Sequence, residues 1–216
     1  NWNIPVSSLT RGFAQCSRII CQTTWQSEQV FNTFLHHLPA QRVQQIPSGV
    51  ETTDVAFKTS HALGQPIKLI TVGTVYPRKR QMDLVQVVDK LATRHVIECW
   101  VVGDTSQAGE WQTRIQADTA NPNANIKWLG AIQDRARVND LLLQADIACF
   151  PSGDESHPLA LLEAGVCALP IVASNLPPYS HIGWTHGKNC LLYPTGDLGQ
   201  LEAQIERLIQ DTGLRS

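Results

Sequence analysis

The feature that most constrains the fold is a regular alternation of short apolar runs with longer amphipathic stretches, from about residue 67 to the C-terminus. The apolar runs are nearly continuous, which is typical of parallel strands covered on both faces. Between them, apolar residues recur at helical spacing. We therefore predict an α/β fold with a doubly wound parallel sheet and right-handed crossovers. The predicted strands are 67–75, 95–103, 125–130, 146–152, 169–174 and 189–194.

The helices predicted between these strands carry recognisable start signals. Asp134 is a plausible N-cap for one of them, and Ser156 for another, with Pro158 in its first turn. The predicted helices are 80–93, 107–121, 134–145, the stretch "PLALLEAGVCAL" from residue 158, and 198–211.

The N-terminal part is less regular. We predict a strand at 18–23, a helix at 24–36 and a strand from 42 that stops at Pro47, while 52–66 lack periodicity. The predicted organisation is a first segment at 1–41, a linker at 42–66, a sheet domain at 67–211 and a tail at 212–216.

Composition excludes several classes of protein. Of the 216 residues, 43% are hydrophobic, which is enough to bury a core. A net charge of −2 argues against nucleic-acid binding through a broad basic face. The six cysteines form no CxxC pair, and we expect buried free thiols in a reducing, cytoplasmic compartment. No run of about 20 apolar residues, signal peptide or metal-ligand spacing is recognised.

The loops that follow the strands should hold the chemistry, since ligands of such sheets bind beyond the carboxyl ends of the strands. Gly73, Gly103 and Gly130 each end a predicted strand. They mark either tight turns or the close approach of a ligand to the backbone, and three at one edge favour the ligand. The following run, Arg78 to Arg80, is either a solvated surface or a phosphate-binding group.

A second anion-binding feature is the helix start after the strand 146–152. The N-terminus of a helix attracts phosphate through its free N–H groups and its dipole. Together with the cations near Lys79, this helix could hold one diphosphate. Neither a GxGxxG fingerprint nor a Walker A motif is present.

Two glutamates, separated by seven residues, complete the pattern. Glu163 lies inside a helix that is otherwise apolar, where a carboxylate costs free energy unless it is paired. It either faces solvent or accepts hydrogen bonds from vicinal hydroxyls such as those of a ribose. Glu155 lies in the preceding loop, where it could reach hydroxyls on a group attached to the diphosphate. A hydroxylated group, a diphosphate and a ribose describe a nucleotide-sugar.

At these residues the chain resembles a known family. "GDESHPLALLEAGVCALPIVAS" is similar to the E-x7-E segment of the retaining glycosyltransferases of family 4, the glycosyl transferases group 1, which have the two-domain GT-B fold. "LITVGTVYPRKRQMDLV", "CWVVGD", "IKWLGAIQD", "LLLQADIACFPS" and "GKNCLLYPTGD" resemble other motifs of its C-terminal domain, in the same order. The resemblance implies a Rossmann-like domain that forms the C-terminal half of a GT-B fold.

The resemblance implies roles for individual residues. Glu163 would bind the ribose, Glu155 the donor sugar and Lys79 the diphosphate, while the backbone near Ala131 and Ile132 would meet the base. Catalytic roles would fall to Glu155, Lys79 and Arg78. The donor-binding set, to which the strand-end Gly103 is added, is Gly73, Thr74, Gly103, Ala131, Ile132, Ser156, His157, Pro158, Leu159 and Glu163.

The chain departs from the family at three positions within these motifs. Thr74 stands where the family often has arginine, and we expect Arg78 to replace it. Arg80 replaces a glycine after the phosphate lysine. Pro158 also replaces a glycine, which removes one backbone N–H from phosphate binding.

The implied activity is transfer of a sugar from a nucleotide-diphosphate sugar to a hydroxyl, with retention, in polysaccharide or glycolipid biosynthesis. No DxD motif is present, so we expect neither a metal nor a cofactor. The chain has no room for the N-terminal acceptor domain, of which 1–41 would be the last strand and helix. Alone, it should therefore bind donor but transfer poorly, and any peripheral membrane contact would run through the missing domain.

Three alternatives remain open. The chain could be a non-catalytic nucleotide-sugar-binding or regulatory module. It could also belong to another GT-B enzyme, such as an epimerase or a phosphorylase. A generic flavodoxin-like domain would explain the alternation of strands and helices, but not the ordered set of motifs.

Overall fold

The larger part of the molecule is a six-stranded parallel sheet in the order β5-β4-β3-β6-β7-β8. The computed structural model describes residues 6–30, 32–33, 40–53 and 55–215. The predicted doubly wound parallel α/β sheet is confirmed, with strands slightly shorter than predicted. They are β3 (Ile67–Val72), β4 (Ile97–Val102), β5 (Ile126–Gly130), β6 (Ile147–Phe150), β7 (Ile171–Ser174) and β8 (Leu191–Tyr193).

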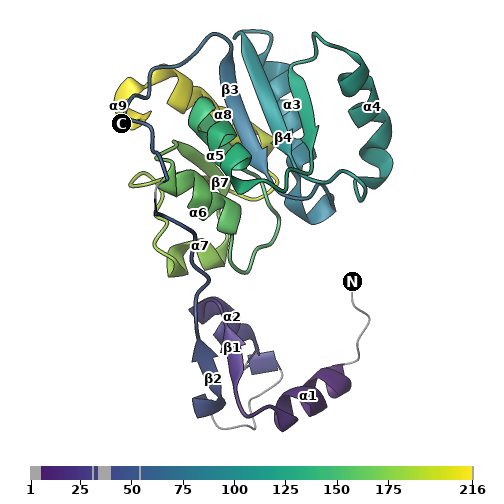
Figure 1. The fold of residues 1–216 in the computed structure, drawn as a ribbon, viewed down its shortest axis with the longest axis vertical. Helices are drawn as coiled ribbons and strands as arrows, with labels where there is room; N and C mark the ends of the chain where they lie inside the picture. Colours follow the sequence, from purple (N-terminus) through teal and green to yellow (C-terminus); the bar gives the residue numbers. More distant parts are fainter. Residues whose placement is uncertain (1–5, 31, 34–39, 54, 216) are drawn as a thin grey trace.

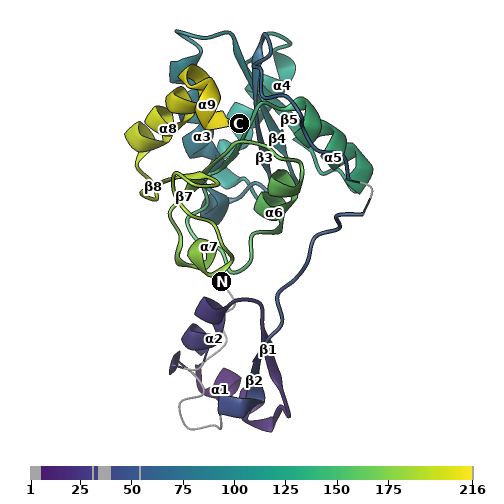
Figure 2. The same cartoon turned by 90° about the vertical axis from the view of Figure 1, so that its left-hand side faces the viewer.

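Helices cover both faces of this sheet, which gives three layers (Figure 2). Helices α3, α4 and α8 pack on one face, and α5, α6 and α7 pack on the other. Their bounds are α3 (Gln81–Leu91), α4 (Gln112–Ala120), α5 (Arg135–Gln144), α6 (Leu159–Val166), α7 (Pro177–His181) and α8 (Leu198–Gln210).

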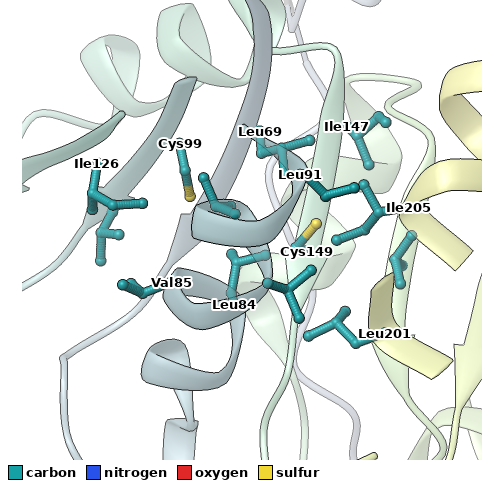
Figure 3. Close-up of a cluster of buried hydrophobic side chains, with 14 of the residues drawn as sticks. Leu69, Leu84, Val85, Leu91, Cys99, Ile126, Ile147, Cys149, Leu201 and Ile205 are labelled. Atoms are coloured by element: carbon teal, nitrogen blue, oxygen red, sulfur yellow. The ribbon is translucent and has the colours of Figure 1, made fainter. Parts of the chain in front are cut away.

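The strands are apolar throughout because both of their faces are buried. In β4, Cys99 belongs to the cluster under α3 and α8, whereas the next residue, Trp100, belongs to the cluster under α5 and α6. The first cluster centres on Leu69 and Leu84, which are both fully buried (Figure 3). Full burial of such a side chain stabilises the fold by about 1.5–3 kcal/mol.

A smaller unit precedes the sheet domain (Figure 1). It contains α1 (Val6–Gln15), β1 (Ile19–Cys21), α2 (Thr24–Val30) and β2 (Val43–Gln45). Strands β1 and β2 pair in parallel, and α2 packs against α7 of the sheet domain.

Three predictions for this region need correction. Helix α1 was not anticipated, so the segment contains more than one strand and one helix. The predicted helix 24–36 is helical to Val30 in α2, and most of its remainder lies outside the described residues. The predicted boundary at residue 42 falls inside the small sheet, because β2 pairs with β1 rather than starting a linker.

The C-terminal residues do not form a tail. Thr212–Arg215 form the short helix α9, and Arg215 is buried. Its guanidinium donates hydrogen bonds to the carbonyls of His61, Leu208 and Ile209. These contacts hold α9 against α8 and against the segment that leads into β3. Because His61 is far from Arg215 in the chain, no local sequence pattern predicts this arrangement.

The sheet places its ligand-binding edge at β3 and β6. Strands β3 and β6 are neighbours, and the connection after β3 runs to β4 while the connection after β6 runs in the opposite direction, to β7. At such a switch point the loops at the carboxyl ends of the strands separate and leave a crevice. The loops concerned here are the β3–α3 loop, residues 73–80, and the β6–α6 loop, residues 151–158.

The strand-end glycines have different roles in the structure. A Cβ atom on Gly103 would lie 2.0 Å from the carbonyl oxygen of Gly73, whereas one on Gly130 would meet open space. The glycine at 103 therefore allows the loops after β3 and β4 to touch. This close approach explains why the position is a glycine without any need for a ligand. Gly130 has a φ of +67°, which disfavours any residue with a side chain.

We expect Gly103→Ala to cost more stability than Gly130→Ala. The Gly130 variant should lose about 1 kcal/mol from its left-handed backbone alone. The Gly103 variant should lose at least about twice as much, because its methyl group also collides with backbone that cannot rotate away. Urea unfolding of the two variants measures the difference, and equal losses would contradict the close approach.

Candidate functional site

A cavity of about 210 Å³ lies at the switch point of the sheet. The β3–α3 loop, the β6–α6 loop and the first turns of α6 line it. The lining residues that the sequence had singled out are Gly73, Lys79, Glu155, His157, Pro158 and Leu159.

A larger cavity of about 320 Å³ lies at the amino edge of the sheet, near Pro170 and Cys190, which precede β7 and β8. We assign function to the smaller cavity because it lies at the carboxyl edge, where ligands of α/β sheets bind. It also contains the ion pair described next.

An ion pair joins the two loops at the smaller cavity. Lys79 Nζ lies 2.6 Å from Glu155 Oε1, and Ser152 Oγ donates to the same oxygen at 2.7 Å. Glu155 is 7% exposed, so its carboxylate depends on these two donors. Among the described residues, none donates a hydrogen bond to Oε2, which leaves that oxygen for a ligand hydroxyl.

The β3–α3 loop that carries Lys79 is held from within. Gln81, which is 2% exposed, donates from Nε2 to the carbonyl oxygens of Gly73 and Thr74. The sequence analysis missed Gln81 and Ser152, because a helix-start glutamine and a strand-end serine carry no distinctive spacing.

Arg78 does not line the cavity. Its guanidinium donates to the Asp154 carbonyl oxygen at 3.0 Å and to the Tyr76 hydroxyl oxygen at 2.5 Å. The side chain is 39% exposed and also lies over the Tyr76 ring. Arg78 thus ties the two loops together at the rim, while Lys79 is the cation inside.

Helix α6 begins two residues later than its predicted cap. Its N-cap is Pro158, not Ser156, and no side chain caps it. The reason is steric, since a proline disfavours helical backbone in the residue before it, here His157. Among the described residues, the backbone N–H groups of Ser156 and His157 have no hydrogen-bond partner. These N–H groups and the start of α6 together form a site suited to an anion.

Glu163 has a protein partner. Its Oε1 lies 2.6 Å from Nη1 of Arg135, the first residue of α5. Asp134 caps α5 as predicted, by accepting a hydrogen bond from the Ala136 N–H, and so places Arg135 at the helix start. The Glu163 side chain is 19% exposed and that of Arg135 is 72% exposed. A neighbouring side chain thus pairs with Glu163, which is only partly exposed to solvent.

Glu163 and Arg135 line a separate pocket of about 90 Å³, together with Glu51 from the linker. Ala131 and Ile132 follow β5, and the partly buried Ile132 packs on the core under α5 and α6. Neither of them lines the 210 Å³ cavity, and neither do Thr74, Gly103 and Ser156. The cavity thus brings together only part of the expected phosphate and sugar set, namely Gly73, Lys79, Glu155 and His157 to Leu159, while Thr74, Arg78, Ser156 and the expected nucleoside residues lie outside its lining.

Other features of the described residues bear on the site. All six cysteines are free thiols, and five are buried, whereas Cys16 is exposed, contrary to the prediction of buried thiols. Within residues 6–30, 32–33, 40–53 and 55–215, no three His, Cys, Asp or Glu side chains are grouped so that they could hold a metal ion. No helix in that part of the chain is long and apolar enough to span a membrane.

Comparison with known proteins decides the family. Residues 53–216 match the family Glycosyl transferases group 1. The chain belongs to this family. The predicted resemblance to the glycosyl transferases group 1 is thereby confirmed, as is the Rossmann-like domain of the GT-B type.

The curated relatives of this glycosyltransferase domain are distant and longer. The phosphatidylinositol N-acetylglucosaminyltransferase GPI3 subunit of Saccharomyces cerevisiae is 25% identical over 78% of this chain and 38% of its own length. The phosphatidyl-myo-inositol mannosyltransferase of Mycolicibacterium smegmatis is 29% identical over 65% of this chain and 35% of its own. The chain thus spans less than half the length of these relatives.

Solved structures share the fold. Alr3699/HepE of Anabaena, crystallised with UDP and glucose, superimposes with a TM-score of 0.79 at 17% identity. The superposition covers 97% of this chain and 58% of that one. TarM superimposes with a TM-score of 0.77 at 15% identity, and this superposition covers 97% of this chain and 40% of the TarM chain.

We expect Lys79→Met to destabilise the domain more than Glu155→Gln. Removal of the lysine leaves a buried carboxylate without its cation, which should cost about 1–3 kcal/mol. Removal of the carboxylate charge leaves a lysine whose side chain is 23% exposed and can reach water, so its loss should stay below about 1 kcal/mol. Urea unfolding of both variants measures this.

The control for this pair is Arg135→Met, since Arg135 is largely exposed and its ion pair should contribute less than about 1 kcal/mol. A Glu155→Gln variant less stable than Lys79→Met would show that the carboxylate does not depend on Lys79.

Proposed function

We propose that this chain is the donor-binding domain of a glycosyltransferase that transfers a sugar from a nucleotide-diphosphate sugar to a hydroxyl, with retention and without a metal ion. The observation that carries the proposal is the grouping of Lys79, Glu155 and His157, whose backbone N–H is free among the described residues, around one cavity at the switch point. A cation and backbone donors suit a diphosphate, and a carboxylate oxygen suits a sugar hydroxyl.

In this proposal the diphosphate lies between Lys79 and the N–H groups of Ser156 and His157. Lys79 would then be shared between Glu155 and a phosphate oxygen. As the bond to the sugar breaks, negative charge grows on the diphosphate, and these fixed donors stabilise it more than they stabilise the bound donor. Glu155 Oε2, which has no donor among the described residues, accepts from a hydroxyl of the sugar.

The nucleoside would extend from the cavity toward α5. Glu163 would accept hydrogen bonds from the ribose hydroxyls while Arg135 keeps one of its oxygens in place. The backbone near Ala131 and Ile132 would meet the base, and Arg78 would stabilise the loops from the rim. Crystals of the structurally similar Anabaena protein contain UDP or UDP-glucose, so UDP is the first probe.

The acceptor and the setting are also proposals. The two relatives named above act on phosphatidylinositol, and a third, AmsK of Erwinia amylovora, is a glycosyltransferase of amylovoran biosynthesis. These relatives support a glycolipid or polysaccharide acceptor. The family 4 assignment and the retaining outcome rest on the E-x7-E pattern of Glu155 and Glu163. The free thiols of the described residues support a cytoplasmic location.

The chain covers less than half of its curated relatives, so the acceptor would bind to a further domain. Because transfer needs an oriented acceptor and a closed cleft, the chain alone should bind donor and transfer poorly. The family match does not favour the alternative of a non-catalytic module.

The test is calorimetric titration of the chain with UDP, GDP and ADP in the presence of a chelator. We expect one diphosphate, UDP first, to bind, and Glu163→Ala to weaken it at least about tenfold by removing charged hydrogen bonds to the ribose. The control Glu110→Ala, at an exposed position before α4, should bind like the wild type. The proposal would be contradicted if the folded wild type bound no nucleoside diphosphate. It would also be contradicted if the Glu163→Ala variant bound UDP as tightly as the wild type.

A further inference from the structure

His157 connects the candidate site to a distant part of the chain. It lines the 210 Å³ cavity from the β6–α6 loop, and its Nε2 lies 2.7 Å from the backbone carbonyl oxygen of Ser48. A carbonyl oxygen can only accept, so Nε2 must carry the hydrogen. The other ring nitrogen, Nδ1, is buried without a partner in the described part of the chain. The imidazole therefore makes one hydrogen bond, to the linker.

Ser48 is held from its other side by the N-terminal unit. Its hydroxyl oxygen accepts a hydrogen bond from Gln22 Nε2 at 2.6 Å. Gln22 directly follows β1, and its own N–H donates to Gln26 of α2. A continuous path of hydrogen bonds thus runs from α2 through Gln22 and Ser48 to His157.

The β6–α6 loop has few other anchors at this point. Gly153 N–H donates to the Arg78 carbonyl at 2.7 Å, the Arg78 guanidinium donates to the Asp154 carbonyl at 3.0 Å, and Glu155 is held by Lys79 and Ser152. Beyond Glu155, the N–H groups of Ser156 and His157 have no partner among the described residues. The His157 carbonyl oxygen accepts a hydrogen bond from the Leu159 N–H at 3.0 Å, while the Glu155 and His157 side chains hold the segment on either side.

We propose that His157 is a positioning residue that fixes the β6–α6 loop against the linker. The position of the N-terminal unit then determines where the anion-binding N–H groups lie. The anchor itself stands on the contacts with Ser48 and Gln22, and its effect on ligand binding rests on the proposed function. His157 supplies a donor on Nε2, and it does not act on the donor sugar directly. Any side chain that places an N–H at that point should replace it.

Substitutions can separate the two ring nitrogens. Glutamine places its amide nitrogen near the position of Nε2, whereas asparagine is shorter and reaches only the position of Nδ1. Phenylalanine keeps the ring and removes both nitrogens. His157→Gln should therefore keep the anchor, while His157→Asn and His157→Phe should lose it.

The first experiment reads the anchor without any ligand, by NMR of the chain labelled with ¹⁵N-histidine. We expect the Nε2–H signal of His157, assigned by its absence in His157→Phe, to be protected from exchange with water. It should exchange several-fold faster in Gln22→Ala, because Ser48 is then released. A His157 N–H that exchanges as fast as that of the exposed His181, or one insensitive to Gln22→Ala, would overturn the proposal.

The second experiment is UDP titration of the same variants, with thermal unfolding to show that each is folded. Loss of one hydrogen bond that orders the loop should weaken UDP binding about three- to tenfold in His157→Asn and His157→Phe. His157→Gln and the control His181→Phe should stay within about twofold of the wild type. Binding by His157→Phe equal to the wild type, or by His157→Gln as weak as by His157→Phe, would overturn it.

The two experiments keep the proposals apart. If the wild type binds no nucleoside diphosphate, the proposed function fails, and the protected imidazole proton alone decides whether His157 is the anchor.

Discussion

The ion pair between Lys79 and Glu155 is the contact on which the candidate site depends. It joins two loops that are 76 residues apart in the chain and that meet because β3 and β6 are neighbours in the sheet. A carboxylate as buried as Glu155 is tolerated only beside a cation or other donors. The pair therefore requires the sheet order, and it shapes the cavity that the two loops enclose.

Much of this arrangement could be predicted from the sequence. Continuous apolar runs such as β4 predicted strands buried on both faces, and the parallel order then placed the following loops at one edge. Lys79 and Glu155 were assigned to that edge by their place after β3 and β6. Local pattern and sheet topology together are enough to locate such residues.

The predictions that failed concern residues whose structure is set by contacts between distant segments of the chain. Arg135 was not anticipated as the partner of Glu163, because α5 and α6 approach each other only in the folded chain. The C-terminal residues were predicted as a tail, although the buried guanidinium of Arg215 holds them in place. Ser156 was chosen as a helix cap from its residue type, while the steric effect of the following proline moves the helix start to Leu159.

The candidate site is also held in place by the smaller N-terminal unit. Glu155 is held by Lys79 from the sheet side, and His157 is held by Ser48 from the linker side. The backbone N–H groups proposed to bind phosphate lie between these two anchors. Their placement thus depends on the sheet and on the position of the smaller unit at the same time.

The most direct test of this account is a crystal structure of the chain with bound UDP. We predict phosphate oxygens within hydrogen-bond distance of Lys79 Nζ and of the N–H groups of Ser156 and His157, with the ribose hydroxyls on Glu163. UDP bound instead in the larger cavity near Pro170, or with its diphosphate away from Lys79, would contradict the assignment of the site.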